Sequence, residues 1–184
     1  MPKIMVTEDQ WIRLGMERFS QGGAEALVIE KMALALKCSK SSFYWYFSDR
    51  KTFVRRIVDE WIDRSTKQVM EAASSPASAE EKLAELLRQM FAATRKGDFL
   101  FYLRRLSAKE PAYRKVLEAM EHARMKFAAG LFAKLGMSAE DATSKAWILY
   151  HYYLGWYERH KLDRIAEEDV LRHVNSIRKR LIER

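Results

Sequence analysis

Apolar residues recur at steps of three and four along most of the chain, which is the spacing that places them on one face of an α-helix. The first such segment covers residues 8–20, where Thr7 and Gln10 have the spacing of a capping box that starts a helix. Two short segments, 27–37 and 40–46, follow with the same periodicity. The pattern therefore predicts three helices at the N-terminal end of the chain.

A longer fourth helix is predicted next. Asp49 is a suitable N-cap residue, and an apolar stripe continues from it to about residue 72. The Ser- and Pro-rich segment 74–78 is the clearest break in the chain, and Ser78 opens a second capping box. The break predicts a first module over 1–50, a connecting helix over about 50–72 and a second module over 73–184.

The second module has the same helical pattern. Apolar residues recur at helical spacing between 83 and 135, a long helix is predicted over 139–161 and a last helix over 166–183. Strand-like alternation and internal repeats are absent from the sequence. The predicted fold class is all-α, with about nine helices.

Charge is concentrated in one part of the first module. The 184 residues carry a net charge of +8, and within 31–56 seven cations face a single acid, Asp49. Such a density favours a polyanionic partner, while a solvated helix face is the alternative interpretation. One cysteine permits no internal disulfide, and no apolar run is long enough to span a bilayer, so we expect a cytoplasmic protein.

Signs of an active site are absent from the sequence. The four histidines, at 122, 151, 160 and 173, lack the spacing of metal ligands. The sequence also lacks a phosphate-binding glycine loop and a nucleophile–base motif. We expect no metal, no cofactor and no catalytic activity.

Three short helices followed by a long one is the order of a helix-turn-helix domain, in which one helix enters the DNA major groove. The residues make the interpretation more specific. The chain reads Ser39-Lys40-x-x-Phe43-Tyr44-x-Tyr46-Phe47, followed by Asp49-Arg50-Lys51. This resembles the DNA-binding signature of the TetR family of transcriptional regulators. The resemblance covers residues 8–60 by motif and the remainder by length and helix count.

The resemblance implies a set of DNA-contacting residues, whose hydroxyl, phenol and ammonium groups suit hydrogen bonds to phosphates and base edges. These are Lys40, Ser41, Ser42, Tyr44, Trp45, Arg50 and Lys51. Phe43 and Phe47 are expected in the core, where they anchor the short helix. Three positions depart from the family pattern. Lys37 stands where the turn commonly carries Gly, Val28 where Ser or Thr often caps, and Glu30 where some members have a basic residue.

Helix-turn-helix proteins that read palindromes do so as two-fold dimers. The resemblance places the dimer interface on the last two predicted helices. The expected interface residues are Ile148, Tyr152, Gly155, Val170, Val174, Ile177 and Leu181. Those on the last helix could instead face the chain's own core.

The segment 147–157 is apolar almost all round, so it must be covered on several sides. One side is expected to line a pocket for a small apolar or aromatic effector. The expected lining residues are Met90, Phe91, Thr94, Phe99, Tyr102, Phe127, Leu131, Trp147, Tyr150, His151 and Leu154. For each of these side chains, ordinary core packing is the alternative.

The sequence thus predicts a transcriptional regulator, and more specifically a repressor, with three partners: an operator in double-stranded DNA, a second copy of the chain and a small-molecule effector. The alternative is a helical protein-interaction module that does not bind DNA. Salt-dependent binding to a palindromic duplex separates the two hypotheses.

Overall fold

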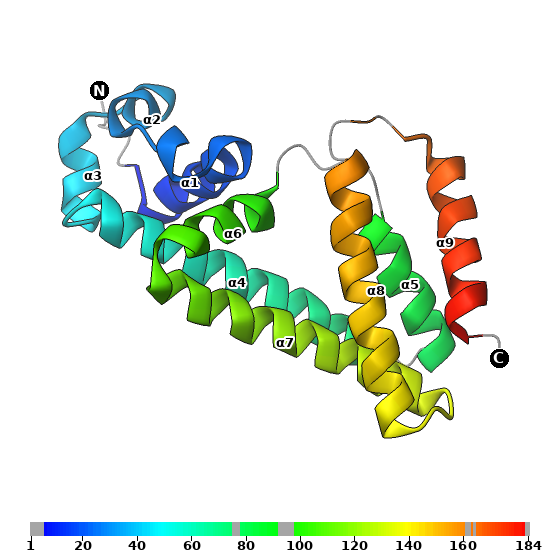
Figure 1. The fold of residues 1–184 in the computed structure, drawn as a ribbon. Helices are drawn as coiled ribbons and strands as arrows, with labels where there is room; N and C mark the ends of the chain where they lie inside the picture. Colours follow the sequence, from blue (N-terminus) through cyan, green and yellow to red (C-terminus); the bar gives the residue numbers. More distant parts are fainter. Residues whose placement is uncertain (1–5, 75–77, 92–97, 161–162, 164, 183–184) are drawn as a thin grey trace. The chain divides into compact units, whose positions relative to one another are not determined.

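The computed structural model describes residues 6–74, 78–91, 98–160, 163 and 165–182, and all regular structure within them is helical (Figure 1). The nine α-helices of these residues confirm the predicted all-α fold class. They are α1 (Glu8–Gly22), α2 (Ile29–Ala35), α3 (Lys40–Tyr46), α4 (Arg50–Ser74), α5 (Ala79–Phe91), α6 (Phe99–Lys109), α7 (Pro111–Lys134), α8 (Ala139–His160) and α9 (Glu167–Ile182). A short 3-10 helix, η1 (Gly23–Ala26), follows α1.

Local capping residues set several helix boundaries. At the start of α1 the backbone N–H of Gln10 donates to Thr7 Oγ1 at 3.3 Å, and that of Thr7 donates to Gln10 Oε1 at 2.8 Å. The same reciprocal pair, between Ser78 and Glu81, opens α5. Before α4, Asp49 Oδ1 accepts from the backbone N–H of Thr52 at 2.7 Å. Each pair satisfies donors that a helix start leaves without partners, and both predicted capping boxes are confirmed.

The helices group into two compact units. The first comprises residues 1–68 and 96–118, and the second comprises 69–95 and 119–184. The segment 96–118, which contains α6, therefore packs with the first unit, whereas the sequence interpretation placed it in the second module. By sequence the first unit carries 18 Lys and Arg against 12 Asp and Glu, so it accounts for +6 of the chain's net charge of +8.

An aromatic core joins α1, α3 and α4 in the first unit. Phe43 is fully buried, and its ring packs edge-on against Trp11 at 5.3 Å and Phe53 at 5.2 Å between centroids. Phe47, the residue after α3, is also buried, and its ring lies 4.7 Å from that of Phe53, which confirms the predicted core positions of Phe43 and Phe47. At Gly15 a Cβ atom would lie 2.5 Å from the Phe53 ring, so a glycine is required for this approach of α1 to α4.

The helix α6 completes the first unit by packing against α1. Phe99 stacks in parallel on Trp61 of α4 at 4.6 Å and contacts Phe19 of α1 at 4.4 Å. The phenol of Tyr102 donates to the backbone carbonyl of Gln21 at 2.9 Å. These contacts fix the C-terminal end of α1 and η1 beside α6.

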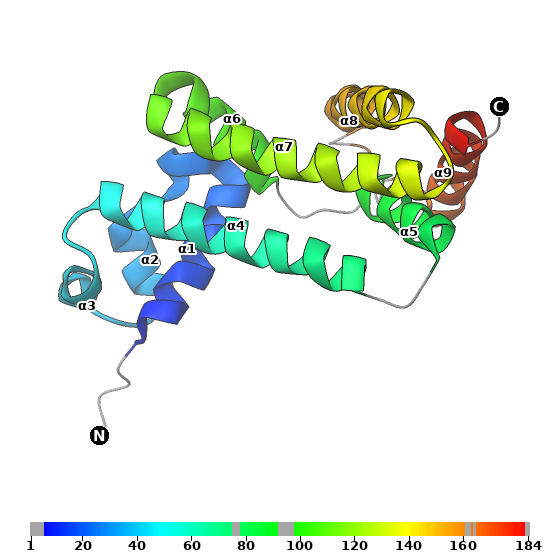
Figure 2. The same cartoon turned by 90° about the horizontal axis from the view of Figure 1, so that it is seen from below.

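The second unit packs α5, the C-terminal part of α7, α8 and α9 around one hydrophobic core (Figure 2). Phe91 and Phe132 are fully buried in it, and α5 contacts both α8 and α9. Its other buried residues are Leu83, Leu87, Ala128, Leu131, Ala142, Ala146, Leu149, Tyr150, Tyr153, Val170, Val174 and Ile177. Among the described residues, none of the helices has the length and apolarity required to cross a membrane.

Candidate nucleic-acid interface

A tight turn over residues 36–39 joins α2 to α3. Within it Lys37 has φ 55°, a left-handed conformation that is costly for a residue with a side chain. The backbone N–H of Cys38 donates to the carbonyl of Ala33 at 3.0 Å and closes the end of α2. Ser39 is the N-cap residue of α3, although its hydroxyl pairs with Ser41 Oγ at 2.6 Å instead of with the helix backbone.

The helix α3 has one exposed face and one buried face. Lys40, Ser41, Tyr44 and Trp45 form the exposed face, which we call the α3 face, and all four belong to the predicted DNA-contacting set. The side chain of Trp45 is 82% exposed and that of Tyr44 is 57% exposed. Large aromatic groups left in solvent beside hydroxyls and an ammonium mark an interaction surface.

The other predicted residue of α3, Ser42, lies on a different side of the helix. Its hydroxyl accepts from the indole N–H of Trp11 at 3.3 Å, in a partly buried contact between α1 and α3. This bond directs Ser42 toward α1, away from the α3 face. Spacing within a helix of seven residues did not reveal it, because the partner is thirty-one positions away in the sequence.

The two predicted basic residues of α4 differ in their surroundings. The guanidinium of Arg50 donates to the backbone carbonyls of Leu27 and Ala24, so it binds the segment that precedes α2. Lys51 is exposed in the first turn of α4. Both residues are exposed, but the guanidinium of Arg50 is already bonded within the first unit.

Glu30 of α2 contributes a contact that sequence reasoning did not anticipate. Its carboxylate accepts from the ammonium of Lys40, with 2.8 Å between Oε1 and Nζ. This hydrogen bond lowers the pKa of Glu30 and raises that of Lys40, because it favours the charged form of each group. The only signal in the sequence was an acid where some members of the TetR family have a basic residue.

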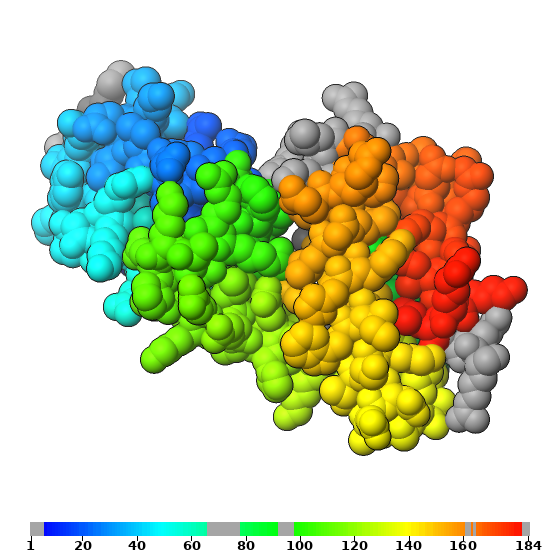
Figure 3. Space-filling model, viewed as in Figure 1, coloured from blue at the N-terminus to red at the C-terminus, as the bar shows by residue number. Residues whose placement is uncertain are grey.

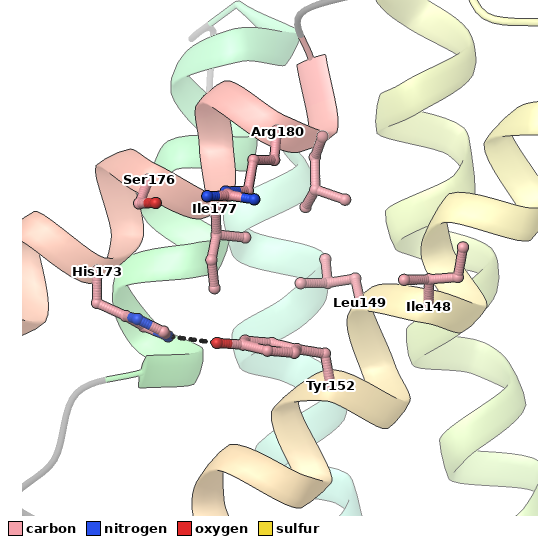
Figure 4. Close-up of a pocket in the computed structure, with 8 residues that line it drawn as sticks. Ile148, Leu149, Tyr152, His173, Ser176, Ile177 and Arg180 are labelled. Carbon is pink, nitrogen blue, oxygen red and sulfur yellow. Dashed lines mark hydrogen bonds between the residues drawn. The ribbon is translucent and has the colours of Figure 1, made fainter.

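A second candidate surface lies in the second unit, between α8 and α9, whose surfaces adjoin in Figure 3. A groove of about 360 Å³ opens between them (Figure 4). The groove has a mainly apolar lining, made by Ile148, Leu149, Tyr152, His173, Ser176, Ile177, Arg180 and Leu181. Within it, His173 Nε2 lies 3.4 Å from the Tyr152 hydroxyl. Trp147 and Leu171 are further large apolar residues exposed on these two helices. We call this combined surface the α8–α9 face.

Solved structures of known proteins share this arrangement of helices. A TetR-family transcriptional regulator from Streptomyces coelicolor matches with a TM-score of 0.77, 16% identity and 95% coverage of both chains. A TetR transcriptional regulator from Legionella pneumophila matches with a TM-score of 0.75 and 12% identity, over 95% of this chain and 98% of that one. A cysteine mutant of the TetR-family regulator CifR, solved with a 26-base-pair operator duplex, has a TM-score of 0.74 and 20% identity, over 97% of this chain and 98% of that one.

The chain has the TetR fold. At these identities the comparison establishes the fold alone, and it agrees with the helix order predicted from the sequence. No family model matches the sequence, and no curated protein matches it.

Within the TetR fold of this chain, the residues predicted for the dimer interface divide into two groups. Val170, Val174 and Ile177 are buried in the core of the second unit, so the structure favours the chain's own core, the second of the two alternatives for this stripe. Leu181 is partly buried against the same core. By contrast Ile148, Tyr152 and Gly155 are exposed on α8, where nothing lies within 4 Å of a Cβ atom built at Gly155.

The residues predicted for the effector pocket are also divided. Phe99 and Tyr102 belong to the first unit, where they pack against α1. Trp147 and His151 are exposed and stack on each other at 4.9 Å. Thr94 lies outside the described residues. The others form or flank the core of the second unit: Met90, Phe91, Phe127, Leu131, Tyr150 and Leu154. Core packing is therefore the observed role of most of this set.

Proposed function

We propose that this chain is a DNA-binding transcriptional regulator, specifically a repressor that binds a palindromic operator as a homodimer. The observation that carries the proposal is the α3 face. Lys40, Tyr44 and Trp45 are presented to solvent by a short helix whose opposite side is fixed by a buried aromatic core. Such a helix can enter the major groove without distortion, and its groups match the donors and acceptors of phosphates and base edges.

The charge distribution supports the same proposal. The first unit carries most of the chain's net positive charge, which includes Lys51, an exposed cation in the first turn of α4. A duplex would gain affinity from these charges through the release of counterions, so binding should weaken steeply with salt. The α8–α9 face supports pairing, because its exposed apolar residues would leave water on contact with a second copy.

We further propose a small apolar or aromatic effector. The proposal rests on the aromatic composition of α8 and its surroundings, since Phe91 contacts Tyr153 and Trp156 while Trp147 and His151 stack in solvent. An effector would change DNA affinity only by binding one arrangement of the two DNA-reading units better than another.

An unbiased selection of duplex sequences on the purified protein tests the DNA-binding proposal. We expect a palindromic site to be enriched, and binding to fall by orders of magnitude between about 50 and 200 mM salt. Lys51→Ala should reduce the salt slope by about one per protomer, whereas Lys134→Ala, a control on α7 in the second unit, should leave it unchanged. A protein that binds no duplex at about 50 mM salt would support the alternative, a protein-interaction module.

A further inference from the structure

The ion pair between Glu30 and Lys40 joins two different helices on the exposed side of the first unit. Glu30 lies in the first turn of α2 and Lys40 is the first residue of α3, and their charged groups are 2.8 Å apart. The side chains are 61% and 56% exposed, respectively. The carboxylate is thereby held at the N-terminal end of α3, adjacent to the α3 face.

The stability of the fold does not depend strongly on this pair. An exposed ion pair is screened by water and salt and contributes little to stability. The helices α2 and α3 are already fixed by buried side chains, among them Met32 and Phe43. The pair therefore has its main effect on what the exposed surface of α2 and α3 binds.

An unpaired lysine at this position would act as a point charge on a flexible stem, and it would bind the nearest phosphate whatever the sequence. The carboxylate of Glu30 offsets that attraction and repels phosphates itself. Base edges can form hydrogen bonds with both groups, because an ammonium donates to guanine O6 and N7 while a carboxylate accepts from the cytosine N4 amine. The N-terminal residues of a recognition helix are those that reach base edges.

We propose that Glu30 is a specificity-determining residue that acts with Lys40 as one donor–acceptor unit, reading guanine and cytosine in each half-site and disfavouring other DNA. The proposal rests on the DNA-binding function proposed above and deepens it. On non-specific DNA the carboxylate lowers affinity, because it keeps the ammonium from the phosphates. On the operator the pair keeps both charges hydrogen-bonded while it contacts the bases.

The test compares binding of the wild type and Glu30→Gln to the selected operator and to an unrelated duplex of equal length. Glu30→Gln removes the negative charge and preserves the size of the side chain. We expect it to bind the unrelated duplex more tightly, with a salt slope steeper by about one per protomer as Lys40 reaches a phosphate. The ratio of operator to unrelated affinity should fall by at least about fivefold per half-site. A selection on Glu30→Gln should lose the preference for a G·C pair at one position.

Two controls separate this role from a general effect of charge. Glu25→Gln removes the same charge from η1, in the same unit, and should leave the specificity ratio unchanged. In a Lys40→Met background Glu30→Gln should cause no further loss of specificity, because the unit is already broken. If the wild type selects an operator and Glu30→Gln retains its full specificity ratio, the inference fails and the proposed function stands. If the wild type binds no duplex, both fail.

Discussion

Arg50 is hydrogen-bonded to the backbone of Leu27, with 3.2 Å between its Nε atom and the Leu27 carbonyl oxygen. The same guanidinium donates to the carbonyl of Ala24. One side chain thereby ties the start of α4 to η1 and to the residue that follows it. The planar fork of arginine allows two such bonds at once, which a lysine ammonium cannot reproduce with the same geometry.

Arg50→Ala should therefore act first on stability and only then on DNA binding. Two carbonyls lose their donor and α2 is held less firmly, so we expect the midpoint of thermal unfolding to fall by a few degrees, roughly 3–6 °C. Affinity for all duplexes should fall together. Lys51→Ala, the neighbouring control, should reduce duplex affinity with no change in the midpoint. An Arg50→Ala protein as stable as the wild type would point to a phosphate-binding role for Arg50 instead.

Lys37 offers a site for stabilisation. Its φ of 55° is strained for lysine and unstrained for glycine, so Lys37→Gly should raise the free energy of unfolding by about 0.5–1 kcal/mol, net of the greater entropy of glycine in the unfolded chain. Lys37→Ala is the matched control, because it removes the same charge and retains the strain. Chemical denaturation of the three proteins measures the difference. Equal stability of the glycine and alanine variants would show that no strain is relieved.

Helix boundaries could be predicted from the sequence because they depend on neighbouring residues. The pairs Thr7–Gln10 and Ser78–Glu81 are three residues apart, and their bonds form largely independently of the rest of the fold. The predicted span 40–46 coincides with α3, and the predicted span of about 50–72 ends two residues before α4 does. The buried position of Phe43 could also be predicted, because a short helix needs an apolar side chain that anchors it in the core.

The sequence could not reveal what covers each apolar face. Periodicity shows that the last helix has an apolar stripe, but not whether Val174 meets the chain's own core or a partner. The contact between Phe19 and Phe99 joins segments eighty positions apart, so no local pattern placed Phe99 in the first unit. The Glu30–Lys40 pair was hidden for the same reason, because ten positions separate residues on two different helices.

Gly15 should tolerate no side chain. An alanine Cβ there would lie 2.5 Å from the buried Phe53 ring and 2.9 Å from Ile57, so Gly15→Ala should destabilise the protein by about 1–3 kcal/mol despite the higher helix propensity of alanine. Gly130→Ala on α7 is the control, since nothing lies within 4 Å of its added Cβ atom. That variant should be stabilised by about 0.5–1 kcal/mol. Thermal unfolding of both distinguishes steric clash from helix propensity, and a stabilised Gly15→Ala would contradict the packing of α1 on α4.

His173 should make the second unit sensitive to acid. Its ring packs against Phe91, Tyr152 and Trp156, and burial lowers its pKa, with a further contribution from His160. The unfolded chain therefore takes up the proton first as the pH falls. The stabilisation from neutral His173 is fully present above about 6.5, the usual pKa of histidine, and is lost as the pH falls through the lower folded value.

The prediction for His173 is tested by thermal unfolding at several pH values between about 7.5 and 5.5, spanning the usual pKa of histidine. His173→Gln should lose less stability over this interval than the wild type, because it has no proton to gain. His122→Gln, an exposed histidine on α7, serves as the control and should retain the full dependence on pH. An unchanged slope in His173→Gln would assign the acid sensitivity to other groups.

The α8–α9 face should be where two copies meet, and Ile148 is the residue that tests this most directly. Its side chain is 60% exposed and lines the groove beside Tyr152, so its substitution disturbs a partner more than the chain's own core. Ile148→Asp would place a charge in an interface that excludes water, at a cost large enough to dissociate a dimer. We expect sedimentation of a monomer at micromolar concentration. Operator affinity should also fall, because one half-site alone provides too few contacts.

Leu34→Asp is the matched control for assembly, since Leu34 is 79% exposed on α2 in the other unit and its variant should remain dimeric. If Ile148→Asp also sediments as a dimer, then the two copies pair through a different surface.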